Sequence, residues 1–389
     1  MKKQKVLKFF CSLFLLVCMI FVSMIPIAGQ GITEREASYM IKEPNAVAAM
    51  IYDADGVFTA KCVGNETGGT RIAAEALEGL MLYPGGMPFG VKFITEGVTV
   101  VGTGDVETQK GRVNPAQTAG LRERDVILAI NGHEIAGAAH LTDAIEKSEG
   151  RAIKLRCRRG EREFDVTLTP VYCPAEGRYK TGIWVRDSGA GIGTVTFIMP
   201  ETGAFAGLGH GICDASTGAL IPMRRGSVSD VTISAVVRGA AGNPGEIKGY
   251  FNAGKVGALL GNSTCGVWGV FSEVPEITRE AMPIAMRDEI EEGDATILCT
   301  LDSNKMDEYD IRITNINRDA SGSKCFTVTV TDPDLLAASG GIVQGMSGSP
   351  ILQNGKIVGA VTHVLINDPA RGYGIFIENM LANMPVPAR

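Results

Sequence analysis

The sequence predicts a mainly β protein with two folded units. Its 389 residues include 49 glycines but only 6% aromatic residues, a composition that favours turn-rich β structure over helical bundles. Short apolar stretches recur along the chain, and Gly, Pro, Asn and Asp separate them. With 45% hydrophobic residues, a chain of this length can bury two ordinary cores.

Residues 1–30 are predicted to be a targeting segment. Four lysines lie among the first eight residues, and an uncharged run of 20 residues follows, from Phe9 to Ala28. This arrangement predicts a cytoplasmic N-terminus and a chain that is exported across the membrane. The run is about long enough to span the membrane as an anchor. Pro26 and the small residue Gly29 fit a cleaved signal peptide instead, so both alternatives stay open.

Charge and cysteine content narrow the range of partners. The net charge is −6, and without the four N-terminal lysines the remainder carries −10, which argues against nucleic acid as a partner. The nine cysteines include no CxxC pair, so we expect free core thiols and no metal site. Nothing in the sequence requires an organic cofactor.

Residues 31–79 are weakly patterned, and we expect a stalk or linker there.

The first folded unit is predicted over residues 80–172. A glycine-rich turn leads into strands, Asn131-Gly132 is a strong hairpin signal, and a helical stretch covers residues 139–148. The string NPAQTAGLRERDVILAINGHEI, residues 114–135, resembles the PDZ domains attached to bacterial periplasmic serine proteases.

The PDZ resemblance implies a peptide-binding site. A PDZ domain adds an extended peptide to a sheet edge and captures its terminal carboxylate with backbone N–H groups. The matching turn is GMPFGV, in which Gly86 and Gly90 permit the required backbone conformations, and Phe89 and Val91 are expected to line the pocket. The expected ligand is a peptide of the substrate or, alternatively, the chain's own N-terminal segment.

The second unit is predicted over residues 182–389. Many short strands with turn residues between them, and almost no long helical periodicity, indicate an all-β barrel or sandwich. Only residues 378–382 have a helical pattern.

The segment QGMSGSP, residues 344–350, carries the chemistry. A serine between glycines on a tight loop can present its hydroxyl, while the amides of Gly345 and Ser347 form an oxyanion hole. The spacing G-x-S-G-x-P resembles the nucleophile loop of chymotrypsin-like proteases, and a hairpin at Asn354-Gly355 follows it. We therefore predict that Ser347 is the nucleophile of a chymotrypsin-like double β-barrel that follows the PDZ domain.

A serine nucleophile needs a general base, and histidine suits that role near neutral pH. His210 lies on a loop of small residues and precedes the serine, as the chymotrypsin-like order requires, so it is the predicted base. His363, on the strand after the nucleophile, is the alternative. Met346 and Gly341 stand where trypsin-like enzymes carry acidic residues, so neither ion-pair activation nor specificity for Lys or Arg is expected.

The strings FAGLGHGI and GGIVQGMSGSPILQNGKIVGAVTHVL resemble the stage IV sporulation protein B peptidase family. The resemblance implies a serine peptidase that is exported from the forespore into the space between the two spore membranes. There it would cleave itself and then the extracytoplasmic part of a membrane-bound inhibitory complex, which frees an intramembrane metalloprotease to process a sigma factor.

The same resemblance points to Asp332 as the third catalytic residue. Asp334 is its nearest competitor, and an ordinary Asp-Pro turn is the structural alternative. A second hypothesis for the whole chain is a catalytically inactive PDZ and protease-like protein that binds peptides in signalling. Labelling with a serine-directed reagent distinguishes the two.

Overall fold

The computed structural model describes residues 79–214, 218–302 and 305–384, together with Leu77 and the backbone of a short hairpin. The hairpin consists of β1 (Ala48–Tyr52) and β2 (Phe58–Cys62). The predicted targeting segment and most of the predicted stalk therefore lie outside the described residues. Within the described part, no helix is both long and apolar enough to cross a membrane.

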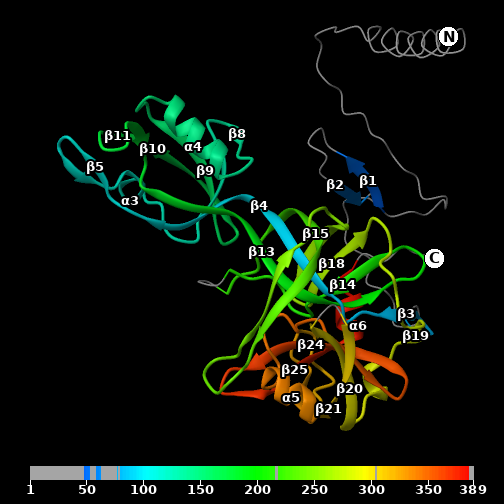
Figure 1. Ribbon diagram of the computed structural model, residues 1–389. Helices are drawn as coiled ribbons and strands as arrows, with labels where there is room; N and C mark the ends of the chain where they lie inside the picture. The colour runs from blue at the N-terminus through cyan, green and yellow to red at the C-terminus, as the bar shows by residue number, and fades with distance from the viewer. Residues whose placement is uncertain are drawn as a thin grey trace, which may run out of the picture.

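Two strands of 16 residues each, β4 (Pro88–Thr103) and β13 (Ile183–Ile198), organise the molecule. They pair antiparallel with each other over most of their length. One end of the pair belongs to a PDZ unit and the other belongs to a β-barrel, as Figure 1 shows. The structure differs here from the predicted boundaries, because the PDZ unit is inserted into the first barrel and does not precede it.

The PDZ unit is a small sheet with one main helix. Its elements between the two long strands are β5 (Val106–Thr108), β6 (Gly111–Val113), α3 (Pro115–Thr118), β7 (Val126–Ile130), β8 (His133–Glu134), α4 (Ala138–Lys147), β9 (Ile153–Arg159), β10 (Arg162–Leu168), β11 (Val171–Cys173) and β12 (Arg178–Lys180). The sheet runs in the order β10, β9, β7, β4, and Leu141 and Ile145 of α4 are buried in its core. Asn131 and Gly132 have positive φ angles of 51° and 85°, as the predicted hairpin turn requires.

The first barrel is built around the other ends of β4 and β13. Its further strands are β14 (Ala204–Gly207), β15 (Met223–Val237), β17 (Gly257–Ser263) and β18 (Gly266–Phe271), with β3 (Met81–Pro84), β16 (Glu246–Phe251) and β19 (Met282–Pro283) at its margins. The pairings run from β4 through β15, β17, β18 and β14 to β13, and the β13–β4 pairing completes the circuit. Phe89, Phe205 and Phe271 pack in its core, with an edge-to-face contact between the first two rings.

The second barrel is closed. In pairing order its strands are β20 (Gly293–Asp302), β21 (Lys305–Thr314), β22 (Phe326–Val330), β25 (Asp368–Phe376), β24 (Lys356–Leu365) and β23 (Pro350–Gln353). Helix α5 (Pro333–Ser339) follows β22, helix α6 (Ile377–Leu381) follows β25, and the short helix η1 (Arg287–Glu289) precedes β20. The mainly β double-barrel fold with a PDZ domain is thereby confirmed, as is the hairpin at Asn354-Gly355.

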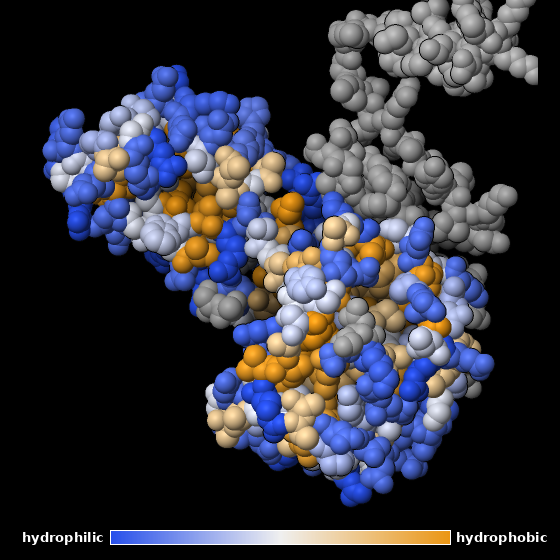
Figure 2. Space-filling view, viewed as in Figure 1, coloured by the Kyte–Doolittle hydropathy of each residue, from blue (hydrophilic) through white to orange (hydrophobic). Residues whose placement is uncertain are grey.

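Polar and apolar surface is unevenly distributed. Figure 2 shows hydrophilic side chains over the outer part of the PDZ unit, whereas apolar residues gather over the barrels and on the side of the PDZ unit that faces the barrels.

The six cysteines whose side chains are described all carry free thiols, and five of these side chains are buried.

Candidate active site

Ser347 lies on the loop between α5 and β23. The amides of Met346, Gly348 and Ser349 donate hydrogen bonds to backbone carbonyls. Among the described residues, the amides of Gly345 and Ser347 donate to none. These two are the N–H groups predicted to form the oxyanion hole. An amide that is preorganised and left free can stabilise a developing negative charge.

The loop that carries Ser347 packs closely against the backbone of β13 and of the segment that leads to His210. A side chain at Gly348 would place its Cβ 2.0 Å from the Thr194 carbonyl oxygen and 2.5 Å from the Leu208 nitrogen, so only glycine fits there. Leu208 itself has a φ of 67°, a conformation that non-glycine residues rarely adopt. Strain of this kind costs on the order of 1–3 kcal/mol and is common at functional sites.

The structure brings His210 and His363 together. Their ring centroids are 4.8 Å apart with an angle of 39° between the planes. His210 follows β14, and His363 lies on β24 just after a shift in the pairing register with β25. Such irregularities occur next to active sites because they redirect side chains. Both candidate bases therefore lie at one site.

A backbone carbonyl orients His210. Its Nδ1 lies 3.0 Å from the Gly211 oxygen. A carbonyl can only accept a hydrogen bond, so Nδ1 carries the proton and Nε2 of the neutral ring is left as a proton acceptor. In chymotrypsin-like triads an aspartate occupies the corresponding position at Nδ1 of the histidine. Sequence reasoning missed the contact with Gly211 because any residue can supply a carbonyl.

Burial keeps both imidazoles neutral at physiological pH. It lowers the pKa of His210, and the Gly211 carbonyl partly opposes this effect. The pKa of His363 falls to about 4 because of burial and the nearby charges of His210 and Lys324. The buried Nδ1 of His363 has no hydrogen-bond partner among the described residues. A base with so low a pKa accepts a proton poorly, and these properties favour His210.

The hydroxyl of Ser347 is engaged elsewhere in this structure. Its Oγ donates to the Thr362 carbonyl oxygen at 2.7 Å. A hydroxyl has one proton to donate, so the bond to Thr362 excludes a simultaneous bond to Nε2 of His210. Catalytic hydrogen bonds often form only when substrate is bound. A bond from Ser347 to Nε2 of His210 would therefore require the Ser347 side chain to rotate.

Asp332 has a structural role. It is the N-cap of α5, where Oδ1 accepts the amides of Asp334 and Leu335 at 2.9 and 3.0 Å. Its Oδ2 accepts the amide of Asp310 at 3.3 Å. Among the described residues, His210 has no carboxylate partner. The catalytic roles assigned to Asp332 and to its competitor Asp334 stay predictions.

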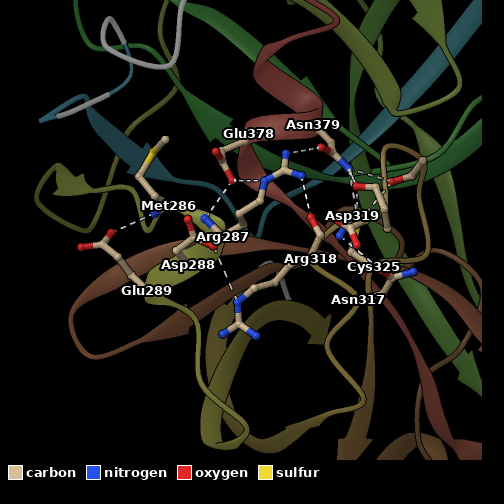
Figure 3. Close-up of polar contacts among 12 residues, drawn as sticks. Met286, Arg287, Asp288, Glu289, Asn317, Arg318, Asp319, Cys325, Glu378 and Asn379 are labelled. Carbon is tan, nitrogen blue, oxygen red and sulfur yellow. Dashed lines mark hydrogen bonds and ion pairs between the residues drawn. The ribbon is translucent and has the colours of Figure 1, made fainter.

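A polar network supports the loop between β21 and β22. In Figure 3 the Arg287 guanidinium lies between Glu378, Asn379 and the Arg318 carbonyl, and it donates to all three. Asn379 in turn donates to carbonyls of residues 320 and 322.

At residue 323, the same loop contacts β24 next to the residues of the candidate site. The Ser323 carbonyl accepts the Thr362 hydroxyl at 2.8 Å, and Lys324 lies over the Tyr373 ring. The network thus fixes the segment that holds Thr362, the residue to which Ser347 donates.

The four residues predicted to bind peptide in the PDZ domain lie in the first barrel instead. Gly86 donates its amide to Val195, and the ring of Phe89 packs in the barrel core. β4 pairs with β13 and β15 on its two edges at Gly90 and Val91, and a side chain at Gly90 would collide with the Phe251 ring. No sheet edge is free there, so this prediction was wrong.

A different strand edge is free in the PDZ unit. Residues 183–186 of β13 pair with β4 on one side, and no pairing on the other side occurs within the described part of the chain. The end of this segment is fastened to α4, because Asp187 Oδ2 accepts the Ala138 amide at 2.8 Å. Ile183 and Val185 are half-buried against the PDZ core. Sequence reasoning missed this edge, because the residues lie downstream of the PDZ motif.

Comparisons with known proteins cover both units. The profile of the SpoIVB peptidase S55 family matches residues 177–381, more than half of the chain, and a PDZ profile matches residues 114–159. The serine protease HTRA1 of Xenopus tropicalis is 39% identical over 56 residues, a stretch that spans 14% of this chain and 12% of that protein.

Solved structures resemble the chain only distantly. The PDZ domain of the SdrC-like protein from Listeria monocytogenes is 21% identical, with a TM-score of 0.19, over 23% of this chain and 87% of that one. The active form of the Rv3671c protease from M. tuberculosis is 14% identical, with a TM-score of 0.26, over 63% of this chain and 85% of that one. His210, Asp332, Ser347 and His363 all lie within the segment that the peptidase profile matches.

Proposed function

The chain belongs to the SpoIVB peptidase S55 family, and on this basis we propose that it is an exported serine endopeptidase that cleaves itself and a membrane-bound regulatory protein. The proposed place of action is the intermembrane space of a developing spore, with the chain either anchored or secreted there. The proposed substrate is the inhibitory subunit of a membrane-embedded metalloprotease complex, whose cleavage triggers sigma-factor processing. The N-terminal lysines followed by an uncharged run support export.

The pair of free amides at Gly345 and Ser347 carries the catalytic part of the proposal. Substrate binding turns the Ser347 hydroxyl away from Thr362 and towards Nε2 of His210. His210 takes the proton as Ser347 attacks the peptide carbonyl, and the two amides bind the resulting oxyanion. His210 then gives the proton to the leaving amine, and water repeats the sequence to release the acid.

The PDZ domain supplies peptide binding, and its proposed ligand is an extended segment of the substrate or of the chain's own N-terminal region. The free edge of β13 at residues 183–186 can accept such a segment as an additional strand. Half-buried Ala138 of α4 lies at the end of this edge, where its amide donates to Asp187, and it offers an apolar contact there. Ala138→Glu should therefore slow self-cleavage but spare hydrolysis of a small ester. Ala139→Glu, which makes the same change at an exposed position of α4, is the matched control.

A fluorophosphonate that labels activated serines tests the catalytic assignment. Wild-type protein should be labelled, and Ser347→Ala should not. Ser349→Ala removes the neighbouring hydroxyl, which is buried and has no partner among the described residues, and it should still be labelled. Labelling of Ser347→Ala, or no labelling of wild type, would reject Ser347 as an activated nucleophile.

A further inference from the structure

The nucleophile loop is held by β13, and the contacts involve two buried threonine hydroxyls. Thr194 Oγ1 donates to the Gly345 carbonyl at 2.8 Å, and Thr196 Oγ1 donates to the Gly348 carbonyl at 2.8 Å. The Thr194 amide also donates to the Ser347 carbonyl at 2.9 Å. The two threonines are 3% and 0% exposed, so water does not compete for these bonds.

Every carbonyl from residue 344 to residue 348 has a donor. The Gln344 oxygen accepts the Ile247 amide at 2.7 Å, and the Met346 oxygen accepts the Ser349 amide at 2.9 Å. The other three are the carbonyls held by Thr194 and Thr196.

In a trans peptide the C=O and N–H groups point in opposite directions. Fixing the carbonyls of residues 344 and 346 therefore fixes the directions of the Gly345 and Ser347 N–H groups. The carbonyls held by the threonines belong to the peptide planes between and after these two, so they prevent the loop from rotating.

We propose that Thr194 and Thr196 are positioning residues for the oxyanion hole, an inference that rests on the proposed serine peptidase function. Neither hydroxyl needs to touch the substrate. Without the Thr194 hydroxyl, the Gly345 carbonyl would be left without its side-chain donor, and the adjoining peptide planes could rotate to find another. Such rotation turns the Gly345 amide away from the oxyanion. Removing one oxyanion donor lowers kcat by about 10² to 10³ in a well-studied protease.

Threonine-to-valine changes test the proposal, because they replace the hydroxyl with a methyl group at nearly constant volume. We expect Thr194→Val to lower kcat for a small ester at least tenfold with little change in KM, and Thr196→Val to act in the same direction. Thr194→Ser keeps the donor and should recover most of the loss. The affinity for a peptide boronate, which mimics the tetrahedral intermediate, should fall in parallel with kcat.

Thr300→Val is the matched control. Thr300 is also 3% exposed and its hydroxyl also donates to a backbone carbonyl, that of Gly86 at 3.0 Å, but this carbonyl lies outside the nucleophile loop. A loss of kcat no greater in Thr194→Val than in Thr300→Val would overturn the inference. So would an equal loss in Thr194→Ser, or unchanged boronate affinity.

Two further results separate the possible failures. If Thr194→Val does not fold, Thr196→Val against the same control gives the answer. Absence of fluorophosphonate labelling in the wild type would reject the proposed function itself, whereas a labelled wild type with unaffected threonine variants rejects only this inference.

Discussion

Replacing His363 with phenylalanine should make the protein more resistant to acid. His363 is half-buried, and its pKa in the folded protein is about 4, whereas an unfolded histidine has a pKa of about 6.5. The unfolded chain therefore binds this proton more readily than the folded chain. The contribution of the neutral His363 side chain to the free energy of unfolding is therefore fully present above pH 6.5 and is lost as the pH falls towards 4.

The size of the effect follows from the two pKa values. Proton linkage gives a loss of roughly 2 kcal/mol at pH 5 and about 3 kcal/mol at pH 4 relative to neutral pH. Phenylalanine keeps an aromatic ring against His210 and does not titrate, so His363→Phe should escape most of this loss. His210 is present in both proteins, and its own contribution largely cancels in the comparison.

Urea denaturation at pH 7.5 and pH 5.0, followed by circular dichroism, measures this difference. The free energy of unfolding should fall by roughly 2 kcal/mol more in the wild type than in His363→Phe between the two pH values. If both proteins lose the same stability, within about 0.5 kcal/mol, His363 does not have the low pKa that its burial predicts. The reasoning that favours His210 as the base would then lose one of its supports.

Further substitutions probe the site and the first barrel. Ser347→Ala should abolish self-cleavage and substrate cleavage, with a loss of up to about 10⁶ in kcat. His210→Ala should lose as much activity as Ser347→Ala, whereas His363→Ala should lose far less. The reverse order for the two histidine variants would make His363 the base. Asp332→Ser keeps a side chain that can cap α5 and should retain activity within about tenfold of the wild type. Asp332→Ala removes the cap and should lower the free energy of unfolding by about 1 kcal/mol. A loss near 10⁴ in kcat for Asp332→Ser would instead establish the predicted triad role. Lys324→Met removes a nearby positive charge and should raise the pKa of His363 above about 4, as an NMR titration would show; an unchanged or lower pKa contradicts the described geometry. Gly90→Glu should disrupt the first barrel through its collision with Phe251 and reduce ester hydrolysis and self-cleavage together; normal ester hydrolysis would contradict the placement of Gly90.

Local chemistry made much of the fold predictable. The hairpins at Asn131-Gly132 and Asn354-Gly355 follow from two residues that tolerate positive φ angles. The predicted helix at residues 139–148 corresponds to α4, because its apolar residues recur with helical spacing. The predicted final helical turn corresponds to α6, one residue away. All of these signals are contained within short stretches of chain.

Long-range pairing was not predictable in the same way. β4 and β13 each belong to two units, and the division of their residues between these units depends on which strands lie beside them. The glycine-rich turn at residues 86–91 fits a carboxylate-binding loop equally well when it is viewed alone. Only the strands on both its edges exclude that role.

In the candidate active site, the groups that could be predicted from the residues alone were a serine between glycines, two histidines and the amides of Gly345 and Ser347. Side-chain identity and short spacing were sufficient, because nucleophile and base chemistry is restricted to few residue types. The contacts that these groups make depend on the folding of distant segments. The Gly211 carbonyl orients His210, the Thr362 carbonyl engages Ser347, and Asp332 caps a helix. The partners in all three contacts are backbone groups, which recur along the whole chain, so only their positions in space distinguish them.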